Sequence, residues 1–248
     1  MLDFVILIGG AALPSLALAL WIYRRDRARP EPLSLVGRAL VLGFLSTIPT
    51  IIFGLLLDLP TSWLPGTVAR AAWSAFIAAA LLEESIKYFI IKRFFYRLPA
   101  FDETLDGIVY AVMVSLGFAF AENILYGLGS HGWLLLRAFT AVPLHAAAAG
   151  IMGHWFGRAR LQADQAVAGR LLRRGWLLAV LVHGAYDFCL MLGGGLALGA
   201  LLVLLVSLVH LLGLIRQACA YDDRLTGTQA DAGRPEGERL AGGPTIFF

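Results

Sequence analysis

Residues 68–92 read VARAAWSAFIAAALLEESIKYFIIK, an apolar run that is long enough to cross a membrane yet carries Glu83, Glu84 and Lys87. A hydrocarbon core of roughly 30 Å is crossed by about 20 helical residues. Charged side chains are expensive inside that core, and where they occur they usually face a bundle interior or a water-filled cavity. The stretch therefore predicts a membrane-spanning helix whose charged face points at other helices.

The composition of the whole chain agrees with a membrane protein. The chain has 248 residues, of which 59% are hydrophobic and 15% are charged, and its mean hydropathy is +0.76. These values lie outside the range of ordinary soluble domains. We predict an all-α, polytopic membrane bundle of about seven transmembrane helices. The predicted spans are Leu2–Tyr23, Val36–Leu57, Val68–Lys92, Leu105–Leu128, Gly132–Phe156, Gly175–Leu192 and Gly194–Ile215.

The positions of the basic residues predict the orientation. Almost all of the 20 Lys and Arg residues follow the first, third, fifth and seventh spans, and the exceptions are Arg70, Lys87 and Arg137. Cytoplasmic loops hold an excess of Lys and Arg, so we expect the N-terminus outside and the C-terminus in the cytoplasm. The net charge of +3 follows from this bias, and we expect no nucleic-acid partner.

Two parts of unequal length are expected. Residues 1–219 form the transmembrane domain, with the chemistry-bearing motifs in residues 70–191. Residues 220–248 form a cytoplasmic tail that is rich in Gly, Asp and Arg and lacks helical periodicity. Such a composition predicts disorder for the tail.

Polar residues in four successive spans mark a candidate site. Their spacing matters, because residues three or four apart share one helical face. Glu83 and Lys87 can pair, which leaves Glu84 turned about 100° away. We expect the acids and imidazoles of the four spans to lie in one slab around the membrane midplane. The candidate site residues are Glu83, Glu84, Lys87, Glu122, Asn123, His145, His183 and Asp187.

Two kinds of hydrolytic chemistry fit this set. Carboxylates and imidazoles in a wet cavity can take a proton from water and give one to a leaving amine, which is peptide hydrolysis by general acid and base. The same groups could instead ligate a divalent metal such as zinc, which would activate the water. The HExxH signature is absent. If a metal is present, the candidate ligands are Glu83, Glu122, His145, His183 and Asp187.

Other interpretations apply to the same residues. The Glu83–Lys87 pair can be a structural ion pair, and Arg137 is interpreted as a snorkelling or ion-paired residue. Gly150, Gly153 and Gly157 are expected to permit close helix packing. A proton-coupled transporter with a buried relay is the main alternative function, and it predicts discontinuous helices and paired halves. The sequence contains no evident sign of either.

Four motifs in four successive spans carry a resemblance to a known family. "EESIK" at residues 83–87, "FAFAEN" at residues 118–123, His145 and "HGAYD" at residues 183–187 occur in the order found in the PrsW family of bacterial intramembrane proteases. That family is related to the CAAX prenyl endopeptidases and the bacteriocin-processing membrane proteases. The resemblance covers about residues 70–191.

The resemblance implies a protease that cuts near or within the bacterial cytoplasmic membrane. Glu83 would be the water-activating base, with Glu84 and Lys87 in support. The CAAX relatives carry His where this chain has Glu122 and Asn where it has Asp187, so Asp187 is protonated, orients His183, or belongs to a metal site. The best-known role of the family implies a single-span, membrane-anchored anti-sigma factor as the substrate, cleaved at site one.

Overall fold

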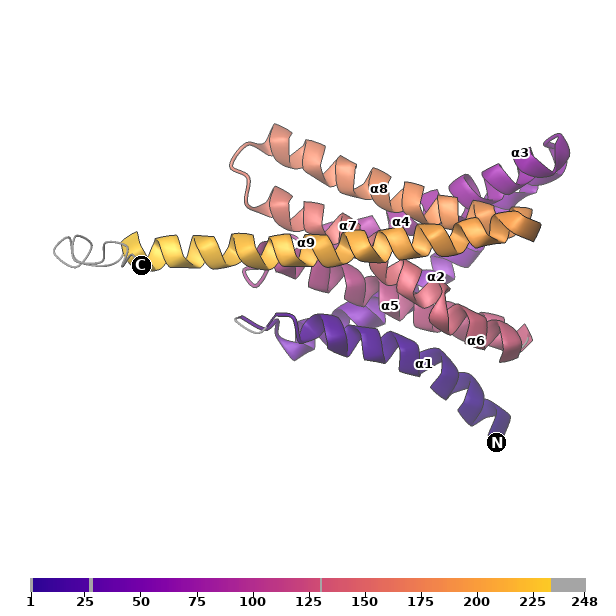
Figure 1. The fold of residues 1–248 in the computed structure, drawn as a ribbon, viewed down its shortest axis with the longest axis horizontal. Coiled ribbons are helices and arrows are strands. Elements are labelled where there is room, and N and C mark those ends of the chain that lie inside the picture. Colours follow the sequence, from indigo (N-terminus) through magenta and orange to yellow (C-terminus); the bar gives the residue numbers. More distant parts are fainter. Residues whose placement is uncertain (1, 27–28, 130, 233–248) are drawn as a thin grey trace, which may run out of the picture.

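The computed structural model of the chain describes residues 2–26, 29–129 and 131–232. All the regular elements in these residues are helices, and they contain no strand. The long helices run roughly along one axis and pack against one another as a bundle (Figure 1). The predicted fold class, an all-α polytopic membrane bundle, is confirmed.

The helices follow one another with short connections. In chain order the elements are α1 (Leu2–Tyr23), α2 (Leu33–Asp58), the 3₁₀ helix η1 (Leu59–Trp63), α3 (Gly66–Trp73), the π-helix η2 (Ser74–Leu81), α4 (Leu82–Phe94), α5 (Thr104–Gly129), α6 (His131–Phe139), α7 (Ala141–Arg160), α8 (Gln165–Leu192), the 3₁₀ helix η3 (Gly194–Leu196) and α9 (Ala197–Ala232).

Five helical stretches are long and apolar enough to cross a membrane, and they correspond to five of the seven predicted spans. These stretches are Leu33–Trp63, Thr104–Gly129, Leu134–Arg160, Gln165–Leu192 and Gly194–Leu225. The other two predicted spans are α1, which is shorter in its apolar part, and the uninterrupted helical path α3–η2–α4, which carries the charged motif. Together they make a seven-helix membrane protein.

Helix α5 lies at the centre of the bundle. Every residue from Thr104 to Ala119 is buried, which is expected of a helix that is apolar on all sides and packs against neighbours all round. Helix α7 approaches α5 very closely, because a Cβ atom on Gly153 would overlap the carbonyl oxygen of Gly107 and one on Gly157 would overlap that of Thr104. The predicted role of these two α7 glycines in close helix packing is confirmed.

The fifth predicted span is broken, which the sequence prediction missed. Helix α6 ends at Phe139, Thr140 adopts φ −121° and ψ −65°, and α7 begins at Ala141. Pro143 explains the break, because it has no N–H to donate to the carbonyl of Phe139 and its ring crowds the preceding turn. The Thr140 hydroxyl donates to the Leu136 carbonyl at 2.8 Å, and the Thr140 N–H donates to the same carbonyl at 3.1 Å. The sequence contains no evident sign of a discontinuous helix, and this break is one that it did not reveal.

The start of the predicted tail is helical. Helix α9 continues to Ala232, so residues 220–232 are helical where the composition predicts disorder; residues 233–248 lie outside the described residues. The buried side chain of Asp222 explains part of this extension. Its two carboxylate oxygens accept hydrogen bonds from the backbone N–H groups of Thr104 and Leu105, at 2.9 and 3.0 Å. These groups are free donors at the N-terminus of α5, so Asp222 fastens α9 to the central helix.

The ends of the bundle differ in the way that the orientation requires. The N-terminus and α3 lie at one end, whereas the connection between α7 and α8 and the C-terminal end of α9 lie at the other (Figure 1). The connection after α7 is flanked by Arg158 and Arg160. The orientation itself remains a prediction.

Candidate active site

The glutamates of the site stand at the first turn of α4, directly after the π-helix η2. π-Helical turns are rare and frequently lie at functional sites. Two contacts hold this region against α8: Trp176 Nε1 donates to Ser85 Oγ at 3.1 Å, and Gly184 faces the ring of Phe76 so closely that a Cβ atom would overlap it. The position of the glutamates is thus fixed by the helix on which the motif histidine His183 also lies.

Lys87 is the centre of a buried network. Its side chain is fully buried, and its Nζ donates to Glu84 Oε1 at 2.8 Å and to Glu83 Oε2 at 3.3 Å. It also lies 3.1 Å from His145 Nδ1. The predicted pairing of Lys87 with Glu83 is confirmed. The expectation that Glu84 is turned away was wrong, because Glu84 is three residues from Lys87 and makes the shorter contact.

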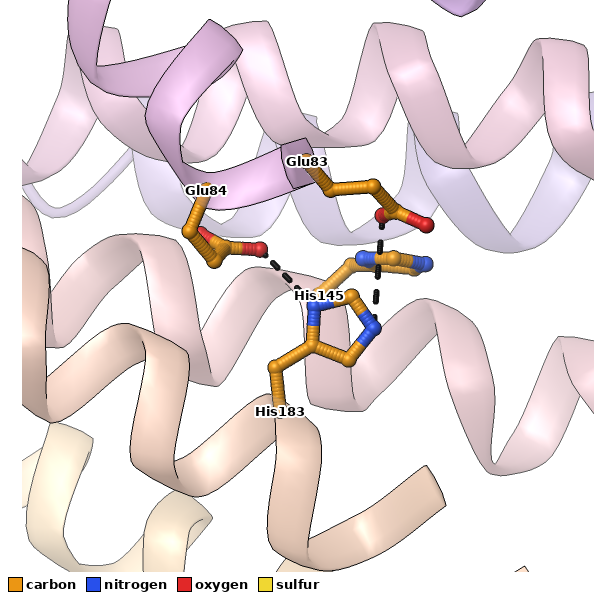
Figure 2. A group of neighbouring side chains, drawn as sticks. All are labelled: Glu83, Glu84, His145 and His183. Carbon is orange, nitrogen blue, oxygen red and sulfur yellow. Dashed lines mark hydrogen bonds and ion pairs between the residues drawn. The ribbon is translucent and has the colours of Figure 1, made fainter. Parts of the chain in front are cut away.

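His183 joins α8 to the two glutamates of α4. Its Nδ1 lies 3.0 Å from Glu84 Oε1. Its Nε2 lies 3.3 Å from Asp187 Oδ2 and 4.0 Å from Glu83 Oε2. Figure 2 shows His183 pointing up from α8 toward both glutamates, with the His145 ring beside it. The two imidazole rings are 5.0 Å apart and nearly perpendicular.

The second ring nitrogen of His145 contacts the ion pair between Glu122 and Arg137. Its Nε2 lies 2.9 Å from Glu122 Oε2, and the same oxygen lies 2.5 Å from Arg137 Nη2. Arg137 Nε in turn donates to Asn123 Oδ1 at 3.1 Å. Because the Lys87 ammonium can only donate, His145 Nδ1 accepts from it, and Nε2 is the nitrogen that donates to Glu122.

All eight residues predicted for the site therefore belong to one connected network, with Asn123 joined to it only through Arg137. Arg137 is the member that was not included in the predicted site. Its predicted ion pairing is confirmed, with Glu122 as the partner. The signal in the sequence was a cation in a span adjacent to one with a buried acid.

The residues at the centre fit a divalent metal. Glu83, Glu84, His145 and His183 each offer a ligand atom within 4.8 Å of the others, and two carboxylates with two imidazoles form a donor set that suits zinc. Glu84 Oε2 is buried without a hydrogen-bond partner among the described residues, which leaves a lone pair to offer. The Lys87 ammonium contacts three of these four residues and would compete with a cation for them.

The close group differs from the predicted set of metal ligands at three residues. Glu84 belongs to the close group, whereas Glu122 and Asp187 do not. Each of these outer acids contacts a ring nitrogen of one histidine instead. Carboxylates in this position orient an imidazole and raise its basicity, and they are the usual second partners of metal-binding histidines.

A cavity of about 480 Å³ reaches the site from the side of α6, α8 and α9. Its polar lining includes Arg137 and Asp187, while most of the remaining lining is apolar and includes Leu136, Leu198 and Leu201. The Asp187 side chain is 21% exposed, whereas Glu84 is fully buried. The network is therefore accessible to solvent at Asp187 and shielded from solvent at Glu84.

Known proteins similar to this chain point to one family. Residues 31–213 match the family described as PrsW family intramembrane metalloprotease. The chain is 40% identical over 186 residues to Protease PrsW of Geobacillus kaustophilus, which covers 75% of this chain and 80% of that protein. It is 37% identical over 189 residues to Protease PrsW of Bacillus subtilis, covering 75% and 83%, and 31% identical over 204 residues to Protease PrsW of Clostridioides difficile, covering 80% and 84%. No solved structure matches the chain.

Proposed function

Because the chain belongs to the PrsW family of intramembrane proteases, we propose that it cleaves single-span membrane proteins with a water held between Glu83 and His183. Membership makes the chain a bacterial multi-pass membrane hydrolase with a protein substrate. The finer proposal names the groups that perform the reaction, the kind of substrate, and the cytoplasmic membrane as the location.

The gap between Glu83 and His183 is the observation that carries the proposal. Glu83 Oε2 and His183 Nε2 are 4.0 Å apart, which is too far for a direct hydrogen bond and is the separation at which a bridging water is expected. Glu84 makes the closer contacts of the two acids. Its Oε1 lies 2.8 Å from Lys87 Nζ and 3.0 Å from His183 Nδ1, whereas Glu83 Oε2 lies 3.3 Å from Lys87 Nζ. Glu83 is thus the acid available to a water, and Glu84 anchors the side chains of Lys87 and His183.

Each group then has a chemical role. Glu83 takes a proton from the water while the water oxygen attacks the scissile carbonyl, and Glu83 later gives that proton to the leaving amine. His183 Nε2–H donates to the oxyanion that develops on the carbonyl. Asp187 lies 3.3 Å from the same nitrogen and holds the imidazole in place until the oxyanion replaces it as the acceptor of the Nε2–H. Lys87 keeps the two glutamates from repelling each other. A metal held by the central group would supply Lewis-acid polarisation of the water or the carbonyl.

The substrate proposal rests on the cavity beside α6, α8 and α9. Its largely apolar lining suits an unwound segment of a membrane-spanning helix, and its polar end at Asp187 and Arg137 suits the peptide group that is cut. We extend this to a membrane-anchored anti-sigma factor on the basis of the motif resemblance. Comparing the membrane proteomes of cells with and without the enzyme tests the extension. A single-span anti-sigma protein should keep its outer domain only in cells without the enzyme; no such difference under envelope stress would contradict it.

The reaction itself is tested with purified protein in proteoliposomes and a single-span model substrate. Glu83→Gln should abolish cleavage, because an amide cannot take a proton from water, while the exposed Asp223→Asn control should cleave like the wild type. Each protein is assayed with and without a strong zinc chelator. Loss of wild-type cleavage on chelation, restored by zinc, would place Glu83 in a metal site. Full activity of Glu83→Gln would overturn the assignment.

Family membership does not favour the transporter alternative. The broken helix α6–α7 is one feature that discontinuous transporter helices also have, so a direct experiment is useful. Cleavage in detergent micelles, where no ion gradient exists, separates the two functions. A protease produces cleaved substrate under these conditions, whereas a proton-coupled transporter does not.

A further inference from the structure

A second cluster of buried carboxylates lies apart from the active site. Asp26 and Glu31 belong to the connection between α1 and α2, and Asp106 lies in the first turn of α5. Their exposed fractions are 3%, 3% and 1%. Asp106 and Glu122 are on the same helix, about 24 Å apart along its axis at 1.5 Å per residue. This cluster is therefore distinct from the Glu83 network.

The three carboxylates converge on one point. Each offers an oxygen atom that lies within 4.8 Å of the other two. Glu31 Oε2 accepts a short hydrogen bond from the Tyr110 hydroxyl. Asp106 Oδ2 accepts from the backbone N–H groups of Asp102 and Glu103 at 2.8 and 2.6 Å, so its orientation is fixed by the N-terminus of α5.

Asp26 supplies the independent sign of a ligand. Its Oδ2 is buried and has no hydrogen-bond partner among the described residues, although the backbone N–H groups of Glu31 and Arg29 hydrogen-bond to the carboxylate. A buried anionic oxygen without a partner is costly, because it has lost its hydration and gained nothing in return. The same burial raises the pKa of the Asp26 and Glu31 carboxyls.

Neighbouring charges do not neutralise the cluster. None of its three carboxylates is within ion-pair distance of a Lys or Arg in residues 2–26, 29–129 and 131–232. Arg29 pairs with Glu103 at 3.2 Å and reaches Asp102 at 4.0 Å. The nearby Glu103 and Asp222 add further negative charge. The cluster is thus a group of buried acids without a basic side chain as partner in these residues.

We propose that Asp26, Glu31 and Asp106 bind a hard divalent cation, Ca²⁺ or Mg²⁺, in a site separate from the active centre. Every donor in the group is an oxygen, with no imidazole or thiol, and oxygen ligands are those that these cations prefer. Oxygens that surround an ion at 2.0 to 2.6 Å are themselves no more than about 5 Å apart, as they are here. The bound cation ties the α1–α2 connection to the start of the central helix.

Cation binding by the purified full-length protein tests the site. The protein is stripped with a chelator in detergent micelles and titrated separately with Ca²⁺ and Mg²⁺, with heat of binding and Tm as readouts. We expect saturable binding of one of these cations and a rise in Tm of roughly 5 °C, because a ligand that binds only the folded state stabilises it. Absence of saturable binding up to about 10 mM of either cation would overturn the proposal.

Variants then locate the site. Asp26→Asn and Glu31→Gln should each weaken binding roughly tenfold or more, since affinity follows the number of charged ligands. The exposed Asp223→Asn is the control and should bind like the wild type. If gel filtration shows that Asp26→Asn is misfolded, Glu31→Gln decides in its place. Unchanged cation affinity in the folded variant would overturn the proposal. A wild type that binds no cation, together with a higher Tm in Asp26→Asn, would also overturn it, because shared protons would then hold the carboxylates together.

Discussion

Lys87 Nζ and Glu84 Oε1 lie 2.8 Å apart in a pair from which solvent is fully excluded. Because Lys87 also donates to Glu83 at 3.3 Å, one ammonium is shared by two carboxylates. The acid that holds Lys87 more closely is therefore not the acid that we assign to the water. The two adjacent glutamates of the motif EESIK thus differ in their distance from Lys87.

Replacing Lys87 by Met should destabilise the protein strongly. Removing one partner of a buried ion pair leaves the other charge uncompensated, which costs about 3–5 kcal/mol in the free energy of unfolding. Lys92→Met is the matched control, because Lys92 is exposed and surface changes cost within about 0.5 kcal/mol. Thermal unfolding in micelles compares the two. Equal Tm values for both variants would contradict the buried-pair interpretation.

Arg137 should matter for catalysis through Glu122 and His145. Arg137→Met removes the 2.5 Å contact that holds Glu122, so His145 loses its fixed orientation; loss of such a supporting contact lowers activity about 10–100-fold. Arg137→Lys keeps the charge and should retain more activity. Cleavage rates in proteoliposomes measure this order. Arg70→Met is the control, because the Arg70 side chain is exposed. The idea fails if Arg137→Met cuts as fast as Arg70→Met.

Gly153→Ala should push α5 and α7 apart. The new Cβ atom would overlap the Gly107 carbonyl oxygen, and overpacking of this kind costs about 1–3 kcal/mol. Gly169→Ala is the control, because a Cβ atom there meets nothing within 4 Å and Ala favours the helix over Gly by up to about 1 kcal/mol. We expect Tm to fall in the first variant and to stay or rise in the second. A Tm of Gly153→Ala at or above that of Gly169→Ala would show that the helices do not touch as described.

Asp222→Ala should weaken the attachment of α9 to α5. The substitution frees two backbone N–H groups, and loss of a helix cap costs about 0.5–2 kcal/mol. The adjacent Asp223 is exposed, so Asp223→Ala controls for the loss of charge. Hydrogen exchange at Thr104 and Leu105 should speed up in Asp222→Ala alone. Equal exchange rates in the two variants would contradict the capping role.

The sequence was most informative where polar residues interrupt apolar helices. Glu83, Glu84, Lys87, His145 and His183 stand out because each is expensive in a membrane, and all of them meet in the network. Helical spacing could not say which glutamate is closer to Lys87. A lysine side chain is long enough to reach residues three and four positions before it, and only packing decides between them.

Other features depend on contacts between distant segments. Arg137 meets Glu122 and Asn123 of another helix. The break at Thr140 was not predicted either, because a Pro in a membrane helix does not always cause one. The helical extension of α9 depends on Asp222 meeting residues more than 100 positions earlier in the chain. The Asp26 cluster likewise joins a loop to a helix start. The local sequence composition does not reveal these contacts between distant segments.

The contact between Asp222 and the start of α5 also concerns how the molecule is made. Thr104 is synthesised 118 residues before its capping partner, so the central helix enters the membrane with its N-terminus uncapped. The cap forms only when α9 has left the ribosome. Completion of the bundle is therefore tied to completion of the chain, and a protein truncated before residue 222 would leave its innermost helix unfinished at the end that α9 normally secures.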